Sequence, residues 1–436
     1  MKIENILQNL NIEALNPMQD KTLEASKVKN NIILLSPTGS GKTLAFLISI
    51  INKLDKNISG VQSVILAPTR ELALQIEDVF KKIGSNYKVN VCYGGHSTKI
   101  EINNFSTPPA VLIGTPGRIA FHIRENHFET KNVTSFVLDE FDKALEMGFQ
   151  NDMEFIINSF NKVDFKMLTS ATILKKIPSF TKIENPERIQ YLNDENVLPD
   201  LTFRKVVSKP EEKIDSVVKL VSKIGNETII IFCNHRDAVT RISETLTKKN
   251  VANSSFHGGL DQTERERSLL KFRNKSSRIL ITTDLASRGL DIPEIGHVIH
   301  YQIPEKEDAF IHRNGRTARM KAKGIVYIMV TSEEHYDFID ADMTIEDLSG
   351  KYKMSNSTDF TTIYISAGKK DKINKVDIVG YLIKTGGLNK EDIGLIDVKD
   401  SQSFVAISTF KVKFLLTNLV GTKLKNKKIK LEIAKD

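Results

Sequence analysis

The stretch NIILLSPTGSGKT, residues 31–43, decides the fold of this chain of 436 residues. It opens with an apolar run typical of a buried strand, and TLAFLISIINKL, residues 43–54, continues with the periodicity of a helix. Between the two, Gly39 and Gly41 allow the backbone to turn so that its N–H groups converge on phosphate oxygens. The pattern G-x-x-x-x-G-K-[ST] asks for glycine at position 36, where this chain has serine. The strand and the helix on either side still predict a nucleotide phosphate site.

The same pattern predicts a role for each residue of this loop. Lys42 can reach the β- and γ-phosphates of a nucleotide, and Thr43 can hold Mg²⁺. The loop residues expected to bind the cofactor are Thr38, Gly39, Ser40, Gly41, Lys42 and Thr43. NKLD, residues 52–55, matches the guanine-reading N-K-x-D pattern, but it falls at the end of the helix that leaves the loop, so GTP is not supported.

A second strand end supplies acidic residues. In SFVLDEFD, residues 135–142, Asp139 follows a predicted strand and Glu140 is next to it. Asp139 can hold Mg²⁺ through water, while Glu140 can orient or deprotonate an attacking water molecule. Adjacent acids at a strand end usually form only a solvated turn, and it is the phosphate loop in the same sheet that favours a metal site here.

HRNGRTAR, residues 312–319, contains three arginines at a spacing of three residues. Charge on a transferred phosphoryl group is commonly neutralised by such an arginine, although a basic surface helix has the same pattern. This segment and the phosphate loop belong to different predicted units. The site would therefore be complete only when the two units close.

Apolar runs alternate with amphipathic stretches along most of the chain, which is the pattern of parallel α/β sheets. The rhythm pauses at residues 185–201, where Pro, Asn and Asp accumulate and where we expect a linker. A third unit begins near Thr361 and has the β-α-β-β-α-β order of many RNA-binding modules. The expected strands of the two larger units are residues 31–36, 63–68, 88–93, 110–115, 135–140 and 165–170, then 228–233, 278–283, 297–302 and 324–330.

The net charge of +8 comes from the end of the chain. Residues 351–436 hold 17 lysines, no arginine and 9 acidic residues, whereas the rest of the chain holds 45 basic and 45 acidic residues. An excess made of lysine alone fits sequence-independent contact with phosphates better than the reading of bases. The plainer interpretation is a lysine-rich solvated face. The candidate RNA-binding lysines are Lys369, Lys370, Lys372 and those within residues 423–430.

Composition narrows the class of protein further. With 40% hydrophobic and 27% charged residues, the chain is not a disordered tail, a collagen-like repeat or a disulfide miniprotein. Its two cysteines, Cys92 and Cys233, are expected to be reduced thiols of the core. The sequence has no run of 18 apolar residues and no signal-peptide pattern at its start. We therefore expect a cytoplasmic protein.

Several motifs, in their order along the chain, resemble those of the DEAD-box ATP-dependent RNA helicases. They are SPTGSGKT (36–43), PTREL (68–72), TPGR (115–118), DEFD (139–142), SAT (170–172) and HRNGRTAR (312–319). The third unit, which begins TTIYISAGKKDKI, resembles the RNA-binding domain of the DbpA-type subgroup. The resemblance implies an α/β fold of two tandem RecA-like parallel-sheet domains and a small α+β domain like an RNA-recognition motif. We place these domains at residues 1–195, 203–345 and 360–436.

The resemblance also implies ATP as the nucleotide, RNA as the substrate, and roles for individual residues. Gln19 matches the glutamine that reads adenine. Ser170 and Thr172 match the pair that couples hydrolysis to strand separation, through Asp142 and His312. The implied catalytic set is Lys42, Asp139, Glu140, Ser170, Thr172, His312, Arg316 and Arg319. The implied nucleotide contacts of the second domain are Gly289 and Asp291. The implied RNA contacts are Pro68, Thr69, Arg70, Gly95, Thr115, Gly117 and Arg118 in the first domain, and Gly258, Gln262, Arg265 and Thr283 in the second.

The chain departs from the family pattern at a few positions. Phe141 stands where the family usually has alanine, and it would add a large ring beside the metal site. Ile12 replaces an aromatic residue that stacks on adenine, and Asn314 replaces an apolar residue. In the third unit, Tyr364 and Phe404 lie where RNA-recognition sheets carry stacking aromatics, although core packing explains both rings equally well.

These features predict a helicase that unwinds short RNA duplexes locally with ATP and Mg²⁺, while its basic third unit tethers it to a structured RNA. By resemblance alone, that RNA would be large-subunit ribosomal RNA, the process ribosome assembly within a pre-ribosomal particle, and the protein a monomer. Two alternatives stay open. One is an RNA clamp that hydrolyses ATP too slowly to turn over, which Phe141 keeps in consideration. The other is a DNA translocase, which charge and spacing do not exclude.

Overall fold

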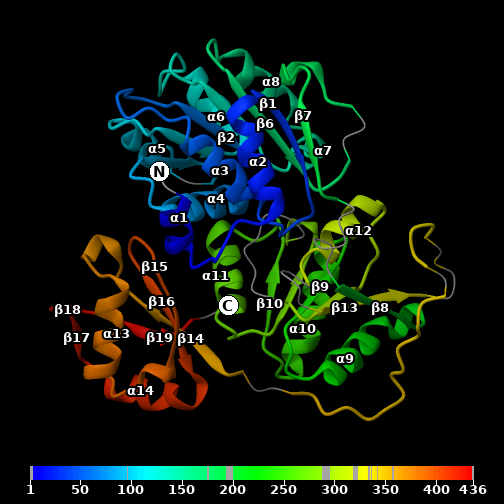
Figure 1. Ribbon diagram of the computed structural model, residues 1–436. Helices are drawn as coiled ribbons and strands as arrows, with labels where there is room; N and C mark the ends of the chain where they lie inside the picture. Colours follow the sequence, from blue (N-terminus) through cyan, green and yellow to red (C-terminus); the bar gives the residue numbers. More distant parts are fainter. Residues whose placement is uncertain are drawn as a thin grey trace. The chain divides into compact units, whose positions relative to one another are not determined.

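A computed structural model describes residues 3–95, 97–173, 176–192, 200–286, 295–317, 323–331, 334, 336–340, 342–355 and 358–434. They fall into two compact units, with the boundary after residue 199 (Figure 1). The described residues of the second unit form a parallel sheet, a smaller antiparallel sheet and a short two-stranded antiparallel pair. Among the described residues, no helix combines the length and the apolar character needed to cross a membrane.

The first unit is built on a parallel sheet of seven described strands in the order β3-β4-β2-β5-β6-β1-β7. Its strands are β1 (Asn31–Leu35), β2 (Ser63–Leu66), β3 (Val89–Cys92), β4 (Val111–Gly114), β5 (Ser135–Leu138), β6 (Phe165–Ser170) and β7 (Glu187–Gln190). Its helices are α1 (Ile3–Leu10), α2 (Pro17–Val28), α3 (Lys42–Ile51), α4 (Arg70–Ile83), α5 (Thr98–Phe105), α6 (Pro116–Arg124), α7 (Phe141–Glu146) and α8 (Gln150–Asn158).

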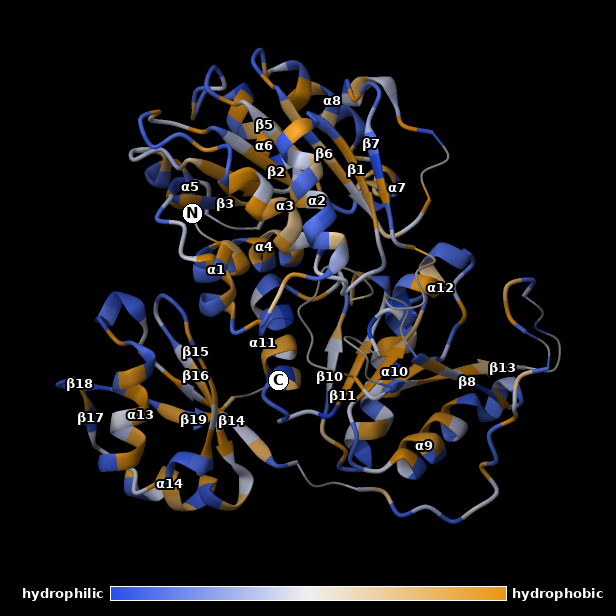
Figure 2. Ribbon diagram, in the orientation of Figure 1, coloured by the Kyte–Doolittle hydropathy of each residue, from blue (hydrophilic) through white to orange (hydrophobic). Residues whose placement is uncertain are grey.

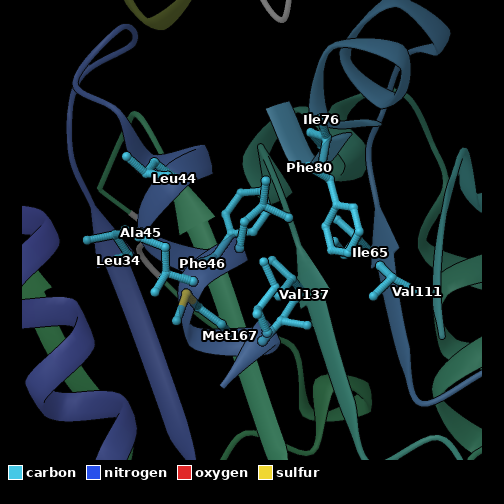
Figure 3. Close-up of a cluster of buried hydrophobic side chains, with 14 of the residues drawn as sticks. Leu34, Leu44, Ala45, Phe46, Ile65, Ile76, Phe80, Val111, Val137 and Met167 are labelled. Carbon is cyan, nitrogen blue, oxygen red and sulfur yellow. The ribbon is translucent and has the colours of Figure 1, made fainter. Parts of the chain in front are cut away.

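Helices cover both faces of this sheet because its strands are apolar on both sides, as Figure 2 shows. Side chains of successive strand residues point to opposite faces. On one face Leu34, Val137 and Met167 pack against α3 and α4, through residues such as Phe46 and Phe80 (Figure 3). The other face packs against α6, α7 and α8. The sheet is therefore fully enclosed, and only its ends are available for a site.

One expectation for this unit is wrong. Residues 185–201 were predicted to be a linker, but β7 (Glu187–Gln190) lies within them and pairs in parallel with β1. The strand forms the edge of the sheet, and among its residues only Ile189 is buried. An edge strand with one buried residue has no apolar run, so its sequence resembles a polar connection.

The second unit begins with another parallel sheet, in the order β10-β11-β9-β12-β13-β8. Its strands are β8 (Asp200–Val207), β9 (Ile229–Phe232), β10 (Asn253–Phe256), β11 (Ile279–Thr282), β12 (His297–His300) and β13 (Lys323–Val330). Its helices are α9 (Lys213–Ile224), α10 (Arg236–Lys248), α11 (Gln262–Arg273) and α12 (Glu307–Asn314), with a short 3₁₀ turn, η3 (Asp284–Ala286). The four predicted strands at residues 228–233, 278–283, 297–302 and 324–330 are present.

The last part of the chain forms an antiparallel sheet in the order β15-β16-β14-β19. Its elements are β14 (Phe360–Ile365), η5 (Lys369–Asp371), α13 (Lys375–Lys384), β15 (Ile393–Val398), β16 (Ser403–Ser408), α14 (Val412–Asn418), the short pair β17 (Lys423–Leu424) and β18 (Lys427–Lys428), and β19 (Leu431–Ile433). The predicted β-α-β-β-α-β order is confirmed, and α13 and α14 pack through Ile378 and Leu415 into one core with the sheet.

Candidate functional site

The glycine-rich loop between β1 and α3 turns through two residues in the left-handed region. Gly39 has a φ of 84° and Gly41 a φ of 89°, values that glycine adopts at little cost. Ser36, which stands where the pattern has glycine, does not have a positive φ. Its backbone N–H donates to the carbonyl of Ser170 at 3.1 Å, as a continuation of the β1–β6 pairing. The serine is therefore compatible with the loop, because position 36 does not need glycine.

Lys42 is the first residue of α3, and its ammonium group is held at the loop. It donates to the carbonyl oxygens of Ser36 at 2.5 Å and Pro37 at 2.9 Å. Ser36 Oγ also donates to Ser40 Oγ at 2.8 Å. These contacts place a buried cation and the start of a helix together, which is the arrangement that binds phosphate in other proteins.

The loop is supported from the side by the start of α2. Asn16 caps this helix, and Asn16 and Gln19 form a capping box. Gln19 Nε2 also donates to the carbonyl of Gly41 at 3.1 Å, and Asn16 Nδ2 donates to that of Ser40 at 2.9 Å. A side chain at Gly41 would collide with Gln19. Gln19, which we expect to read adenine, therefore also fixes the shape of the phosphate loop.

Asp139 follows β5 and lies beside Thr169 of the neighbouring strand β6. Its buried carboxylate accepts hydrogen bonds from the Thr169 hydroxyl and, at 3.1 Å, from the backbone N–H of Glu140. Burial raises the pKa of Asp139, while the Thr169 hydrogen bond and the positive charge of Lys42 oppose this rise. The electrostatic effect of Lys42 shows that the phosphate-binding cation and the expected metal ligand belong to one site.

Glu140 is held in an uncommon backbone conformation, with φ 46° and ψ 51°. Its backbone N–H donates to Thr169 Oγ1 at 3.2 Å in addition to Asp139. A non-glycine residue in this region costs about 1–2 kcal/mol, and such strain is common at functional sites. Sequence reasoning missed Thr169. The signal is the pairing of Leu138 with Leu168, which makes the next residue of each strand a neighbour, and it becomes visible only once the strand order is known.

The turn after β6 connects to the acidic segment through Thr172. Its hydroxyl donates to Asp142 Oδ2 at 2.8 Å. Within the turn, Ser170 Oγ donates to the Thr172 carbonyl at 2.8 Å and accepts from the Thr172 backbone N–H at 3.0 Å. The structure thus brings Ser170, Thr172 and Asp142 together as expected, in direct continuation of the Asp139–Thr169 pair.

Phe141 does not place its ring over the acidic residues. The side chain is fully buried in the core that lies under α6, α7 and α8. It packs against Phe180 with ring centroids 6.2 Å apart. The expectation of a large ring beside the metal site is therefore wrong, because the first residue of α7 points into the apolar core rather than toward the carboxylates.

These residues fit a nucleotide with Mg²⁺. They all follow β1, β5 and β6, which are neighbours in the sheet and end at the same edge. The buried carboxylate of Asp139 and the hydroxyl of Thr43 are oxygen ligands of the kind that Mg²⁺ prefers. Lys42 and the N-terminus of α3 provide the positive potential that phosphates require.

The expected RNA contacts of the first unit follow the other half of the same sheet edge. They come after β2 (Pro68, Thr69 and Arg70), after β3 (Gly95) and after β4 (Thr115, Gly117 and Arg118). These three strands are neighbours in the order β3-β4-β2. Gly95 has a φ of 83° and lies so close to the Arg70 guanidinium that a side chain at Gly95 would collide with it. Short loops rich in Gly, Thr and Arg are therefore gathered at one place.

The expected RNA contacts of the second unit follow its two neighbouring strands β10 and β11. Gly258 and Gln262 come after β10, and Thr283 comes after β11. Arg265 donates from Nη2 to Gln262 Oε1 at 2.8 Å. A side chain at Gly258 would meet no atom within 4 Å. The residues thus form one cluster at the carboxyl ends of two strands.

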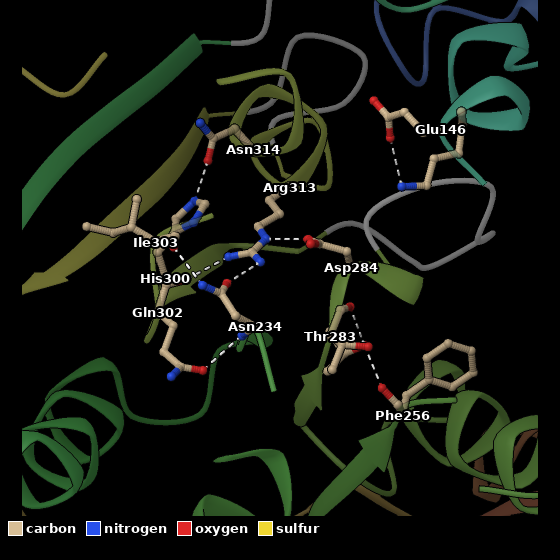
Figure 4. Close-up of polar contacts among 12 residues, drawn as sticks. Glu146, Asn234, Phe256, Thr283, Asp284, His300, Gln302, Ile303, Arg313 and Asn314 are labelled. Atoms are coloured by element: carbon tan, nitrogen blue, oxygen red, sulfur yellow. Dashed lines mark hydrogen bonds and ion pairs between the residues drawn. The ribbon is translucent and has the colours of Figure 1, made fainter. Parts of the chain in front are cut away.

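The arginine-rich motif begins in the last turn of α12, which holds Arg313. Arg313 is fully buried and donates from Nε to Asp284 at 2.6 Å (Figure 4). It also donates to the Gln302 carbonyl at 2.7 Å and to Asn234 Oδ1 at 2.8 Å. Arg313 therefore ties α12 to the segments after β9, β11 and β12. Arg313 is used inside the domain, while Arg319 lies outside the described residues, so the expected placement of the three arginines on one side of a turn or short helix stays a prediction.

Asn314, where the chain departs from the family pattern, is hydrogen-bonded to a residue of β12. Its Oδ1 accepts a hydrogen bond from His300 Nε2 at 2.7 Å, and both side chains are buried (Figure 4). Burial lowers the pKa of His300 to about 3; the charge of Arg313 adds to this shift and the Asn314 hydrogen bond opposes it. His300 is therefore neutral in the folded protein. An apolar residue at 314 would leave its buried N–H without this acceptor.

Some expected site residues cannot be placed. Gly289, Asp291 and Arg319 lie outside the described residues. His312 and Arg316 are described, and both are buried in the second unit.

The structure brings together two lysine-rich stretches that are distant in sequence. Lys369, Lys370 and Lys372 lie at η5, and all three are exposed. Lys425, in the turn between β17 and β18, donates to the carbonyl of Lys372 at 3.1 Å. Lys425 of this turn and Lys427 of β18 are already paired with acids, Lys425 with Asp377 at 2.7 Å and Lys427 with Asp371. The exposed lysines of η5 are therefore the stronger candidates for phosphate contact.

The two aromatic residues of the small sheet pack against each other. The rings of Tyr364 and Phe404 meet edge to face with centroids 5.7 Å apart. Phe404 is buried in a cluster with Leu270 of α11 and Ala434. The Phe404 ring is therefore used in packing, which favours the core interpretation over base stacking for this residue.

Family models match three consecutive parts of the chain. They are described as "DEAD/DEAH box helicase" over residues 16–180, "Helicase conserved C-terminal domain" over residues 212–321 and "DbpA RNA binding domain" over residues 362–433. The first two matches contain the nucleotide and nucleic-acid loops described above, and the third contains the lysines at η5.

Similar proteins bear related names. The chain is 34% identical over 322 residues to "Eukaryotic initiation factor 4A" of Caenorhabditis elegans, which covers 73% of this chain and 80% of that protein. It is 33% identical over 332 residues to "DEAD-box ATP-dependent RNA helicase CshA" of Bacillus cereus, which covers 75% of this chain and 63% of that protein. The chain thus spans less than two thirds of the length of the CshA proteins that it matches.

Solved structures agree with the fold. Mss116p bound to ssRNA and AMP-PNP aligns with a TM-score of 0.68 and 29% identity, over 76% of this chain and 73% of that one. Dbp5 of S. cerevisiae, bound to RNA and ADP BeF3, aligns with a TM-score of 0.69 and 23% identity, over 79% of this chain and 94% of that one. The two parallel sheets are therefore arranged internally as in these proteins.

Proposed function

Because the chain belongs to the family of DEAD-box ATP-dependent RNA helicases, we propose that it is an RNA-dependent ATPase that locally unwinds structured RNA. The observation that carries the proposal is the division of one sheet edge in the first unit. The phosphate loop and the acidic residues follow β1, β5 and β6, while the proposed RNA loops follow β2, β3 and β4. Since β2 and β5 are neighbours, the nucleotide side and the RNA side meet along a single rigid sheet.

The proposed hydrolysis uses residues that the first unit holds in fixed positions. Lys42 and the backbone N–H groups of its loop would bind the phosphates, and Asp139 with Thr43 would hold Mg²⁺. When bound, this ion neutralises charge on the phosphate oxygens. Glu140 would orient a water molecule and accept its proton, which its fixed backbone favours. Arg316 would supply positive charge from the second unit.

A continuous chain of contacts offers a route by which RNA binding could influence hydrolysis. Thr169 contacts both Asp139 and Glu140, and the next residue, Ser170, is bonded to Thr172. Thr172 in turn is bonded to Asp142 on α7. A shift of the turn at residues 170–172 would therefore change the contacts of the Asp139 carboxylate and of the Glu140 backbone.

We further propose large-subunit ribosomal RNA as the target, ribosome assembly as the process and the cytoplasm as the location. The match of residues 362–433 to the DbpA RNA-binding domain supports an RNA tether, and the exposed lysines at η5 give it a physical basis. Cys92 and Cys233 are buried free thiols, which fits a reducing compartment. A monomeric state remains a prediction.

The rival functions can be weighed against the same observations. The alternative of an RNA clamp without turnover rests on Phe141, whose ring is buried in the core, and the rate of ATP hydrolysis tests it. A DNA translocase is tested by comparing DNA and RNA directly, because both nucleic acids offer the phosphates that the proposed loops would contact. Only contacts to the 2′-hydroxyl would favour RNA.

Steady-state ATP hydrolysis tests the proposal. The full chain is assayed without nucleic acid, with single-stranded DNA, with an RNA of the same sequence and with ribosomal RNA. We expect stimulation by RNA but not by DNA, with ribosomal RNA effective at the lowest concentration. Glu140→Gln should reduce the stimulated rate at least about a hundredfold, the lower end of the range for removal of a positioned base.

Each outcome has a distinct meaning. Equal stimulation by DNA and RNA would favour the translocase. RNA that binds in the presence of ATP but does not stimulate hydrolysis would favour the clamp. Equal effects of generic and ribosomal RNA would leave the RNA-dependent ATPase in place and remove the specific target.

A further inference from the structure

Glu101 on α5 is a fully buried acid that contacts one of the proposed RNA-binding arginines. Its Oε2 accepts hydrogen bonds from Arg118 Nε at 2.6 Å and from His122 Nε2 at 2.8 Å. Its Oε1 accepts from the backbone N–H of Tyr93 at 3.1 Å. The side chain of Glu101 has no exposed surface. One carboxylate therefore joins three segments, namely the residue after β3, the start of α6 and the next turn of α6.

Among the described residues, the three contacts of Glu101 given above all come from donors, so this position needs an ionised carboxylate. An amide of the same shape would turn its NH₂ group toward at least one of these N–H groups. Burial alone would raise the pKa of Glu101, but hydrogen bonds from His122, Arg118 and Tyr93 outweigh it and hold the pKa below its ordinary value. A buried charge that keeps its ionised form in this way is matched closely to its partners.

Arg118 is held from several sides in addition. Its Nη2 donates to the hydroxyl of Thr98 at 2.9 Å, and its guanidinium lies 5.3 Å from the centre of the Phe121 ring. The side chain is 15% exposed. Most of the arginine is thus fixed against α5 and α6, and a small part of it stays exposed.

His122 holds Glu101 from within the core. It is fully buried between the rings of Phe105 and Phe121, with centroids at 5.2 and 5.3 Å. Since a carboxylate can only accept, His122 Nε2 donates to Glu101. The other ring nitrogen, Nδ1, lies 2.9 Å from Nδ1 of His127. The resulting chain from His127 through His122 fixes the carboxylate that holds Arg118.

The same cluster includes Cys92, and the set of Cys92, Glu101 and His122 has ligand atoms within 4.8 Å of one another. A metal ion does not fit there. The permanent charge of the Arg118 guanidinium already occupies Glu101 Oε2 at 2.6 Å. Burial also raises the pKa of the Cys92 thiol well above its ordinary value, which keeps the sulfur protonated. The cluster therefore holds the Arg118 side chain rather than a metal ion.

We propose that Glu101 is a positioning residue for RNA binding: it presents the Arg118 guanidinium at the RNA-binding edge of the first unit in one orientation. The proposal rests on the proposed function, because it assumes that Arg118 contacts an RNA phosphate. The contribution of Glu101 is orientation. A free arginine side chain loses rotational entropy when it binds a phosphate, whereas Arg118 has lost most of that freedom in advance.

The direction in which Glu101→Gln changes the affinity for RNA makes the proposal testable. Glu101→Gln removes a negative charge near the proposed RNA site. If charge alone mattered, the variant would bind RNA more tightly. If Glu101 orients Arg118, the variant binds RNA more weakly although its net charge is more positive. A residue that is only structural would change the melting temperature without lowering the affinity of the folded protein for RNA.

The experiment measures RNA affinity by fluorescence anisotropy and the RNA concentration for half-maximal ATPase stimulation, in full-length variants. For Glu101→Gln we expect about a tenfold rise in that concentration, while kcat at saturating RNA stays within about twofold. Arg118→Ala should give a similar rise, and the double variant should be no worse than Arg118→Ala. In these variants, the slope of the logarithm of RNA affinity against the logarithm of salt concentration should become shallower by about 0.7. This is the value for the loss of one phosphate contact with a single strand. Asp78→Asn, which breaks the exposed pair of Asp78 with Lys82 on α4, is the control and should change none of these values.

The outcomes separate this proposal from the proposed function. If RNA fails to stimulate the wild-type ATPase, the proposed function fails first. If the wild type is stimulated, the positioning role of Glu101 is refuted by tighter RNA binding in Glu101→Gln, by unchanged RNA binding, or by additive effects in the double variant. Because the variant could fold poorly, Thr98→Val serves as a milder second test: it removes only the Nη2 contact of Arg118 and should raise the half-maximal RNA concentration by a smaller factor.

Discussion

At residue 141 the chain has a phenylalanine whose ring lies in the core under α7 rather than at the carboxylates. Truncation to Ala, the residue usual in the family, removes a fully buried ring. We expect Phe141→Ala to lower the free energy of unfolding by about 3–5 kcal/mol, while kcat of the folded protein changes by less than about threefold. Urea unfolding and RNA-stimulated ATPase at a temperature where the variant is folded provide the test. A large gain in kcat without loss of stability would mean that the ring restrains the active site after all.

The residues of the site differ in how far sequence alone could assign them. Lys42, Asp139 and Glu140 were predictable because strand ends and glycine turns leave a local pattern. Thr169 was not, because its role depends on the pairing of β5 with β6. Gln19 was assigned to adenine by resemblance, while its contact with the Gly41 carbonyl follows from the packing of α2 against the loop. Contacts between segments distant in sequence carry no local signature.

At the scale of elements, α12 is joined to β12 by a buried pair, Asn314 and His300. The pKa of His300 is lowered to about 3 in the folded protein from an ordinary value of 6.5. The unfolded chain therefore binds a proton below pH 6.5 that the folded protein does not bind. The contribution of His300 to the free energy of unfolding is complete above pH 6.5 and falls as the pH drops from 6.5 toward 3. Between pH 7 and pH 5 we expect a loss of about 2 kcal/mol, measured by urea unfolding at both pH values.

A matched variant isolates this contribution from other titrating groups. His300→Leu combined with Asn314→Leu replaces the polar pair with apolar side chains, so that neither partner is left alone. The double variant should lose about 2 kcal/mol less than the wild type between pH 7 and pH 5. Equal losses in the two proteins would show that His300 is already charged in the fold.

The elements also show where the fold was predictable. Both parallel sheets follow from apolar runs such as residues 63–66 and 229–232, which are buried on both faces. The edge strand β7 was mistaken for part of a linker, because only Ile189 of its residues is buried. An edge strand gains its structure from pairing with β1 rather than from its own composition. A strand such as β7, with a single buried residue, therefore depends on the sheet that it joins, whereas the edge strand β3, which buries two residues, was predictable from sequence.

At the scale of the whole molecule, the excess positive charge is confined to the last part of the chain. In the structure, η5 and the β17–β18 turn gather there, and acids neutralise part of the turn. A test by truncation would be ambiguous, because removal of the small sheet also uncovers Leu270 on α11, which packs against Phe404. Charge reversal in the intact chain avoids this problem.

The paired change Lys369→Glu and Lys370→Glu should weaken binding to a structured ribosomal RNA fragment at least tenfold, because two phosphate contacts are replaced by repulsion. The RNA concentration for half-maximal ATPase stimulation by an unstructured single strand should stay within about twofold. The control is Lys384→Glu with Lys390→Glu. It makes the same change in net charge at exposed positions at and beyond the end of α13 opposite η5. If both pairs weaken structured RNA equally, the lysines act only through overall charge and the small domain has a solvated basic face. If only the η5 pair acts, and only on structured RNA, that domain is a tether with a defined binding surface.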